Sequence, residues 1–218
     1  MIRVGIVDDH QIFRKSLRAL VDSLDGTEVV LDAGDGNELL ELLKTKTIDL
    51  LLLDIQMPGM NGYTTCSIVR KEYPDIKVLI LSQLNSKEAI HKVMEVGAHG
   101  FFTKNANPEE LENAILSIKE REYYFGQELR GALREALDWD TKQLIKKVGS
   151  PKLSEREMEI IKMACKEHKN DAIAHALCIS ILTVESHRKK ILQKTDSKNF
   201  LGVLVFALRN GLLTIEDL

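Results

Sequence analysis

Long apolar runs, cysteine pairs and repeats are scarce in this chain of 218 residues. The three cysteines (Cys66, Cys165 and Cys178) are far apart and form no CxxC pair, which favours small buried thiols in a reducing compartment over a disulfide framework. No stretch approaches the roughly 20 apolar residues of a membrane span. The apolar run at the N-terminus is too short for a signal peptide. We therefore expect a cytoplasmic protein with no membrane partner.

The net charge is also small, at −3, but it is divided unevenly along the chain. Residues 1–122 carry a net charge of −6, whereas residues 123–218 carry +3. This difference in sign favours a first half that binds cations and a second half with a polyanionic partner.

Short apolar runs alternate with amphipathic segments throughout the first 122 residues. This alternation is typical of a parallel sheet covered by helices on both faces. We predict an α/β domain at 1–122, with a doubly wound, five-stranded parallel sheet. The expected strands are 3–7, 28–31, 50–53, 78–81 and 100–103, and the expected helices are 11–24, 38–43, 64–72, 87–96 and 108–120.

Strand signals end after residue 122, and the remaining pattern is helical. A linker at 123–149, expected to be partly helical, contains the only tryptophan, Trp139. The Ser154-x-x-Glu157 spacing is typical of a capping box at a helix start. We predict an all-α domain at 150–218, with helices at 155–167, 171–177, 181–194 and 200–209.

Polar residues follow four of the predicted strands. Asp8 and Asp9 follow the first, Asp54 the third, Ser82 the fourth and Lys104 the fifth. Because the carboxyl ends of parallel strands share one edge, these side chains should converge. Three carboxylates this close together repel one another, and a bound Mg²⁺ ion would offset that repulsion because it prefers oxygen ligands. One carboxylate could then act as a nucleophile toward phosphorus, with the amine and hydroxyl contacting the phosphoryl group.

Four motifs stand at the ends of the predicted strands: Val7-Asp8-Asp9-His10, Leu53-Asp54-Ile55-Gln56-Met57-Pro58-Gly59-Met60-Asn61-Gly62, Leu81-Ser82 and Gly97-Ala98-His99-Gly100-Phe101-Phe102-Thr103-Lys104. In these motifs the first 122 residues resemble a two-component response-regulator receiver, a flavodoxin-like fold. The resemblance implies that Asp54 is the phosphoacceptor, and that Ser82 and Phe101 are switch residues. It implies that Asp9, Asp54 and the main-chain carbonyl of Gln56 bind Mg²⁺, with Asp8 acting through water. Asn105 departs from the proline common after the lysine, which leaves a cis peptide there in doubt.

Two predicted helices between Asn170 and Thr195 are separated by a turn of the length used in a helix-turn-helix. Ser180 is a candidate N-cap for the second helix. That helix has an inward stripe through Val184 and Ile191, and polar and basic residues on its other side. Such a helix can enter the major groove of DNA, with its Lys and Arg side chains near phosphates. A small helical bundle with a solvated basic face fits the same pattern.

Four motifs mark the predicted helical domain: Leu153-Ser154-Glu155-Arg156-Glu157, Asn170-Asp171-Ala172-Ile173-Ala174, Ile179-Ser180-Ile181-Leu182-Thr183-Val184-Glu185-Ser186-His187 and Asn210-Gly211-Leu212. In these motifs residues 150–215 are similar to the LuxR-type (NarL/FixJ) output domain. This resemblance implies a four-helix unit whose last helix supplies a dimer contact. The expected DNA-binding residues are Thr183, Glu185, Ser186, Arg188, Lys189, Lys190 and Lys194.

Together these patterns predict a transcriptional regulator whose binding to double-stranded DNA depends on phosphorylation. The expected partners are a sensor histidine kinase and, after phosphorylation, a second copy of the chain. Two alternatives differ in class. An aspartyl-phosphate phosphohydrolase would need a cap over its substrate, and no insertion within 1–122 is large enough to provide one. A phosphorylation-controlled interaction protein that has lost DNA binding would keep the receiver but show no gel shift.

Overall fold

The computed structural model describes residues 1–83, 92–93, 95–104, 107–121, 123–124, 126, 131, 153–214 and 217. Trp139, Asn105 and most of the predicted linker and 87–96 helix lie outside these residues. Among the described residues, no helix is both long enough and apolar enough to cross a membrane.

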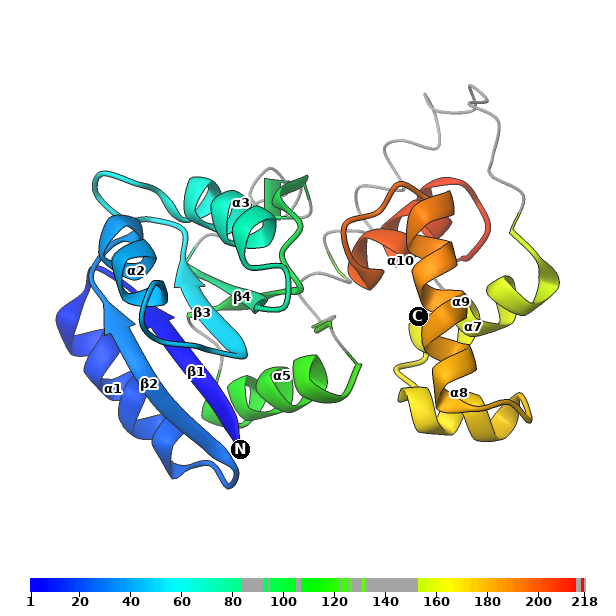
Figure 1. Cartoon of the computed structure of the whole chain (residues 1–218), viewed down its shortest axis with the longest axis horizontal. Helices are drawn as coiled ribbons and strands as arrows, with labels where there is room; N and C mark the ends of the chain where they lie inside the picture. Colours follow the sequence, from blue (N-terminus) through cyan, green and yellow to red (C-terminus); the bar gives the residue numbers. More distant parts are fainter. Residues whose placement is uncertain are drawn as a thin grey trace.

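Five parallel strands form the centre of the N-terminal domain (Figure 1), in the order β2-β1-β3-β4-β5. The inner strands are apolar on both faces because helices cover both. The predicted doubly wound sheet is confirmed. The strands are β1 (Ile2–Val7), β2 (Thr27–Ala33), β3 (Leu50–Asp54), β4 (Lys77–Ser82) and β5 (Gly100–Thr103).

The helices of this domain divide between the two faces. α1 (Gln11–Ser23) and α5 (Pro108–Arg121) pack with Leu52 and Leu79 in one apolar cluster. α2 (Gly36–Leu43) and α3 (Gly62–Glu72) pack with Leu53 and Ile80 in the other. Cys66 of α3 lies in this second cluster, and burial raises the pKa of its thiol to about 12.

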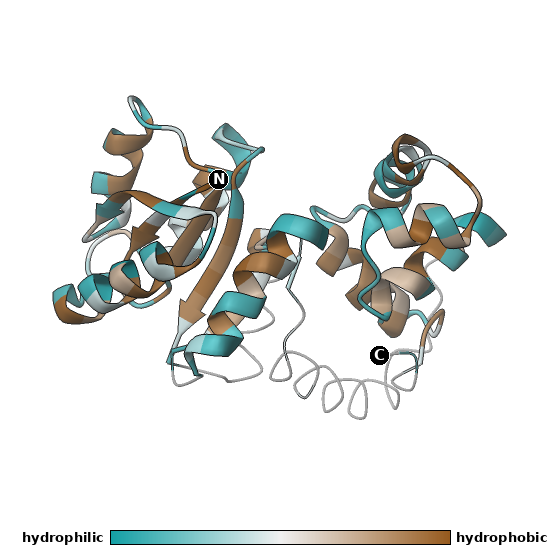
Figure 2. Ribbon diagram, turned by 90° about the horizontal axis from the view of Figure 1, so that it is seen from below, coloured by the Kyte–Doolittle hydropathy of each residue, from teal (hydrophilic) through white to brown (hydrophobic). Residues whose placement is uncertain are grey.

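The C-terminal domain contains α7 (Glu155–Cys165), α8 (Asn170–Ala176), α9 (Ile181–Lys194) and α10 (Phe200–Arg209). Its apolar helix faces turn toward one another (Figure 2). The predicted capping box of Ser154 and Glu157 is present, and the Ser180 side chain caps α9 as expected. The prediction that Cys178 is buried was wrong. It is exposed because it lies in the turn between α8 and α9, with a φ of 53°, and not on a helix face directed into the core.

The two domains are in direct contact. The Asn199 side chain, which caps α10, donates to the main-chain carbonyl of Gly97 at 2.9 Å and also to that of Ala98. The Tyr123 hydroxyl donates to the carbonyl of Ala164, and the Tyr123 ring stacks on Phe200 with the centroids 6.0 Å apart. The receiver-like half therefore covers parts of α7 and α10 of the output half.

Candidate functional site

An ion-pair network occupies the carboxyl edge of the sheet. Nζ of Lys104, which follows β5, lies 2.6 Å from Oδ2 of Asp8 and 2.7 Å from Oδ2 of Asp54. Asp8 follows β1, and Asp54 ends β3. All three side chains are buried, with 6 % of the Lys104 side chain and 2 % of the Asp54 side chain exposed. Three groups that the sequence placed after separate strands thus meet at one point.

Burial controls the protonation of Asp54. It disfavours the charged carboxylate and raises the pKa of Asp54 above its usual value. The Lys104 ammonium opposes this effect, whereas the charge of Asp8 adds to it. One cation is thus shared between two buried carboxylates, so a second positive charge close by would favour the ionised, nucleophilic form of Asp54.

The donor set fits a divalent cation. Asp8, Asp9, His10 and Asp54 each offer one ligand atom, and these atoms lie within 4.8 Å of one another. Three of the four donors are carboxylates, the ligand type that Mg²⁺ prefers. His10 was not predicted from the sequence. Its Nδ1 lies 2.8 Å from Oδ1 of Asp9, and the only sequence signal for it was its place next to the aspartate pair.

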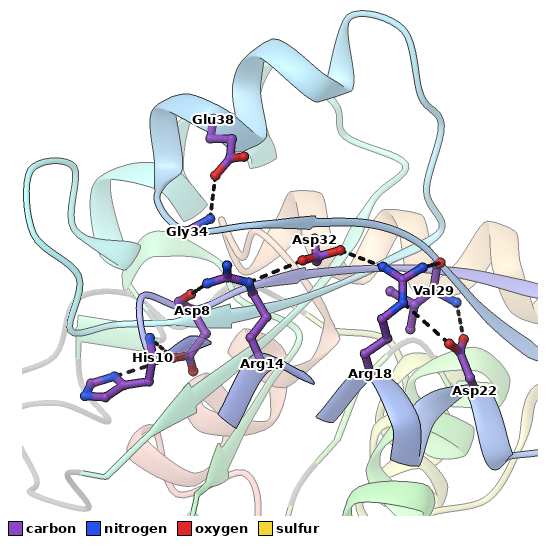
Figure 3. Close-up of polar contacts among 9 residues, drawn as sticks. All are labelled: Asp8, His10, Arg14, Arg18, Asp22, Val29, Asp32, Gly34 and Glu38. Carbon is purple, nitrogen blue, oxygen red and sulfur yellow. Dashed lines mark hydrogen bonds and ion pairs between the residues drawn. The ribbon is translucent and has the colours of Figure 1, made fainter. Parts of the chain in front are cut away.

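Contacts from α1 hold Asp8 in position (Figure 3). The guanidinium of Arg14 donates to the main-chain carbonyl of Asp8 and, at 3.3 Å, to Oδ2 of Asp32 in β2. Arg18, one turn later, donates to Oδ1 of Asp32 at 2.6 Å. The main-chain N–H of His10 donates to Oδ1 of Asp8 at 2.8 Å. The two arginines are positioning residues that the sequence analysis missed, although their spacing of four on a predicted helix was a usable signal.

Gly62 allows α3 to start directly against the end of β3. A Cβ atom here would collide with the main chain of Asp54 and lie 2.7 Å from Cα of Ile55. The main-chain N–H of Gly62 also donates to the carbonyl of Ile55 at 3.0 Å. This close approach explains why the loop after Asp54 ends in glycine.

The remaining receiver residues lie on or beside the same edge. Ser82 ends β4, next to β3, and accepts a hydrogen bond at its carbonyl from the main-chain N–H of Lys104 at 2.8 Å. Phe101 is fully buried in β5. Gln56 is exposed, and its main-chain N–H donates to Oδ1 of Asp54 at 3.3 Å. Switch roles for Ser82 and Phe101 stay predictions.

A second candidate surface lies on α9. Val184 and Ile191 are buried, whereas Glu185, Ser186, Lys189 and Lys190 are exposed. The helix thus has one face in the domain core and one polar face in solvent. Thr183 is half-buried, and its hydroxyl lies 2.8 Å from that of Ser180.

Arg188 and Lys194 differ from the other residues expected to contact DNA. Only 4 % of Arg188 is exposed, because it follows Val184 by four residues on the buried side of α9. Its guanidinium donates to Oδ1 of Asn170 at 2.7 Å and to the carbonyl of Arg121 at 3.0 Å, so it bridges both domains. It also lies over the ring of Phe200, 4.0 Å from the centroid. Arg188 therefore does not face solvent in this arrangement. The Nζ atom of Lys194 lies 2.7 Å from a carboxylate oxygen of Glu157.

Both halves of the chain match known protein families. Residues 4–116 match the family model of the response regulator receiver domain, and residues 151–207 match that of the bacterial regulatory proteins of the luxR family. The chain belongs to the response regulators that carry a luxR-family domain. The predicted family is thereby confirmed.

Relatives match this response regulator over its whole length. The response regulator UvrY of Escherichia coli K12 is 31% identical over 220 residues, covering 100% of the chain and 99% of UvrY. The oxygen regulatory protein NreC of Staphylococcus carnosus is 31% identical over 215 residues, covering 97% of the chain and 99% of NreC.

Solved structures share the two-domain fold. The response regulator ChrA of a heme-sensing two-component system has a TM-score of 0.51 and 30% identity, covering 97% of this chain and 98% of that one. RcsB in a complex with DNA has a TM-score of 0.58 and 21% identity, covering 94% of this chain and 96% of that one. At 21% identity the likeness concerns the fold alone.

Proposed function

We propose that this response regulator is a phosphorylation-dependent, DNA-binding regulator of transcription. The observation that carries the proposal is the ion-pair network of Asp8, Asp54 and Lys104, within one chain that also has a helix-turn-helix with an exposed polar face. A sensor histidine kinase supplies the phosphoryl group, and double-stranded DNA is the ligand of α9.

Asp54 is the nucleophile. One of its carboxylate oxygens attacks the phosphorus of a phosphohistidine on the kinase, so a P–O bond forms as the P–N bond breaks. The imidazole leaves and takes up a proton. Lys104, which already lies 2.7 Å from Asp54, neutralises the added phosphoryl charge. The hydroxyl of Ser82 donates a hydrogen bond to a phosphoryl oxygen. The ring of Phe101 rotates inward when Ser82 moves toward the phosphoryl group.

Mg²⁺ is the proposed cofactor, held by Asp9, Asp54 and the main-chain carbonyl of Gln56, with Asp8 acting through water. When bound, it supplies a compact positive charge beside the phosphoryl oxygens. The grouping of carboxylate oxygens within 4.8 Å supports this assignment.

DNA recognition is assigned to the exposed side of α9. Glu185 and Ser186 are placed for base edges, whereas Lys189 and Lys190 can reach phosphates. Thr183 lies at the N-terminal end of the same helix. Lys194 keeps a contribution through charge, although it pairs with Glu157. Arg188 is outside this surface because its guanidinium is buried.

Phosphorylation is proposed to act on the contact between the domains. The added charge biases the receiver toward a second conformation. In that conformation the loop carbonyls of Gly97 and Ala98 would no longer hold Asn199, and the output domain would separate from the receiver. A dimer of the freed chain would match paired half-sites in DNA.

Mass spectrometry after treatment with acetyl phosphate and Mg²⁺ tests the receiver. We expect one added phosphoryl group on the native chain and none on the Asp54→Asn variant. A native chain that stays unmodified, while a known receiver in the same tube is phosphorylated, would refute the proposal.

A gel shift against genomic DNA fragments tests the output domain. A specific complex separates a DNA-binding regulator from an interaction protein that has lost DNA affinity. The complex should also weaken steeply with salt, because bound phosphates release counterions.

A further inference from the structure

We propose that Leu182 recognises a thymine in the DNA site through the C5-methyl group of that base. This inference rests on the proposed DNA binding and adds an apolar residue to the polar stripe of Ser186, Lys189 and Gln193. It makes Leu182 a specificity-determining residue.

The first observation is the exposure of Leu182. Its side chain and backbone are 76 % exposed, although it is a large apolar residue in the first turn of α9. Val184, two positions later, is fully buried. Leu182 therefore does not contribute to the core of the output domain, and its apolar surface stays in water while the protein is free.

The second observation is its position on the helix. Ser186, Lys189 and Gln193 follow Leu182 by four, seven and eleven residues, so the four side chains form one stripe. All four are exposed, and the stripe lies opposite the buried Val184 and Ile191. Leu182 is the N-terminal member of the stripe that would face DNA, and a recognition helix directs its N-terminal residues toward base edges.

The start of α9 is also fixed. The side chain of Ser180 accepts a hydrogen bond from the main-chain N–H of Thr183 at 3.1 Å, and the hydroxyls of these two residues lie 2.8 Å apart. The turn that carries Leu182 is therefore set before DNA arrives, and little further ordering of its backbone is needed.

The chemistry of the groove selects the base. In the major groove each base edge presents donors and acceptors, and the one apolar group is the C5-methyl of thymine. Leucine can neither donate nor accept a hydrogen bond, so against another base edge it would displace water without replacing its hydrogen bonds. The C5-methyl group of thymine forms no hydrogen bond with water, so a leucine that covers this group leaves no donor or acceptor unpaired.

Replacement of thymine by deoxyuridine tests the proposal, because it removes only that methyl group. A binding site is first selected from genomic DNA with the native chain, and each thymine is then replaced singly. We expect one position per half-site at which deoxyuridine weakens binding about fourfold, the factor for burying one methyl-sized group. The Leu182→Ala variant should bind the unmodified site more weakly and show no further loss with deoxyuridine there.

Two variants serve as controls. Leu182→Met keeps an apolar side chain of similar size and should keep the deoxyuridine penalty. Lys189→Ala lies on the same stripe and should weaken binding while it also keeps the penalty. Circular dichroism checks that each variant is folded, which we expect because both residues are exposed.

The outcomes separate this inference from the proposed function. If the native chain selects a site, and no thymine is sensitive or the sensitivity persists in Leu182→Ala, the role of Leu182 is refuted and DNA binding stands. If the native chain selects no DNA at all, both the proposed function and the inference fail.

Discussion

Substitution of Asn199 by aspartate should separate the two domains without damaging either. Oδ1 of Asn199 accepts a hydrogen bond from the main-chain N–H of Gly202 at 2.9 Å and so caps α10, while Nδ2 donates to the carbonyls of Gly97 and Ala98. Aspartate caps a helix as well as asparagine does. It has no N–H, however, so the two receiver carbonyls lose their donor.

The size of the effect follows from these contacts. Each buried carbonyl that loses its partner costs about 1–3 kcal/mol, so the docked arrangement should lose at least about 2 kcal/mol. That loss shifts the equilibrium between docked and separated domains about 30-fold, since 1.4 kcal/mol is a factor of ten. If docking restrains DNA binding, the unphosphorylated Asn199→Asp variant should bind its site up to about 30-fold more tightly.

Amide hydrogen exchange and DNA titration are the assays. Exchange of peptides covering residues 95–99 should become faster in Asn199→Asp, while the melting temperature of the output domain should be unchanged. Asn199→Ala is the matched control, because it removes the cap as well and should lower that melting temperature. Unchanged exchange in Asn199→Asp would refute the docking contact. Faster exchange with unchanged DNA affinity would refute the restraint.

Three further predictions concern single side chains. Lys104→Gln should lower the rate of phosphorylation by acetyl phosphate at least about tenfold, because the cation that would form a charged hydrogen bond of about 1.5–3 kcal/mol with the incoming phosphoryl group is lost; an unchanged rate by mass spectrometry would contradict this. His99 is buried and accepts at Nδ1 from the N–H of Val78 at 3.0 Å, and burial, with the charges of Arg70 and Lys77, holds its pKa well below the usual value. Below pH about 6.5 only the unfolded chain takes up this proton, so urea titrations should show about 1.4 kcal/mol less stability at pH 5.5 than at pH 7.5 from this group. His99→Asn, which keeps an acceptor, should remove that part of the loss, and an equal loss in the variant would reject the assignment. Maleimide should label exposed Cys178 in the native protein and leave buried Cys66 and Cys165 unlabelled until urea is added, whereas equal labelling of all three would contradict the fold.

Much of the fold follows from the sequence because apolar periodicity is a local signal. The strands at 50–53 and 78–81 were recognised because they are apolar throughout, which sheets covered on both faces require. Helix starts were less certain. α2 begins at Gly36, two residues before the predicted 38, because the Asp35 side chain caps it by accepting from the N–H groups of Asn37 and Glu38.

The receiver site was predictable because topology alone brings strand ends together. Contacts between the domains were not, because they pair residues from separate folding units. Arg188 illustrates the difference. Its charge favours a phosphate contact, but the docking of the domains brings the carbonyl of Arg121 to its guanidinium. Phe200, which lies under the same guanidinium, comes from α10 of the output domain itself. Leu182 was assigned to neither face of the helix in the sequence analysis. Its place seven residues before Lys189 was a signal for the outward face.

The most direct measurement is the DNA affinity of the full chain with and without acetyl phosphate and Mg²⁺, for a fragment selected from genomic DNA, with Asp54→Asn measured in parallel. We predict that the phosphodonor tightens binding of the native chain and leaves Asp54→Asn unchanged. Equal affinities of the native chain under both conditions, with Asp54 shown to be phosphorylated, would contradict a switch that connects the receiver to DNA.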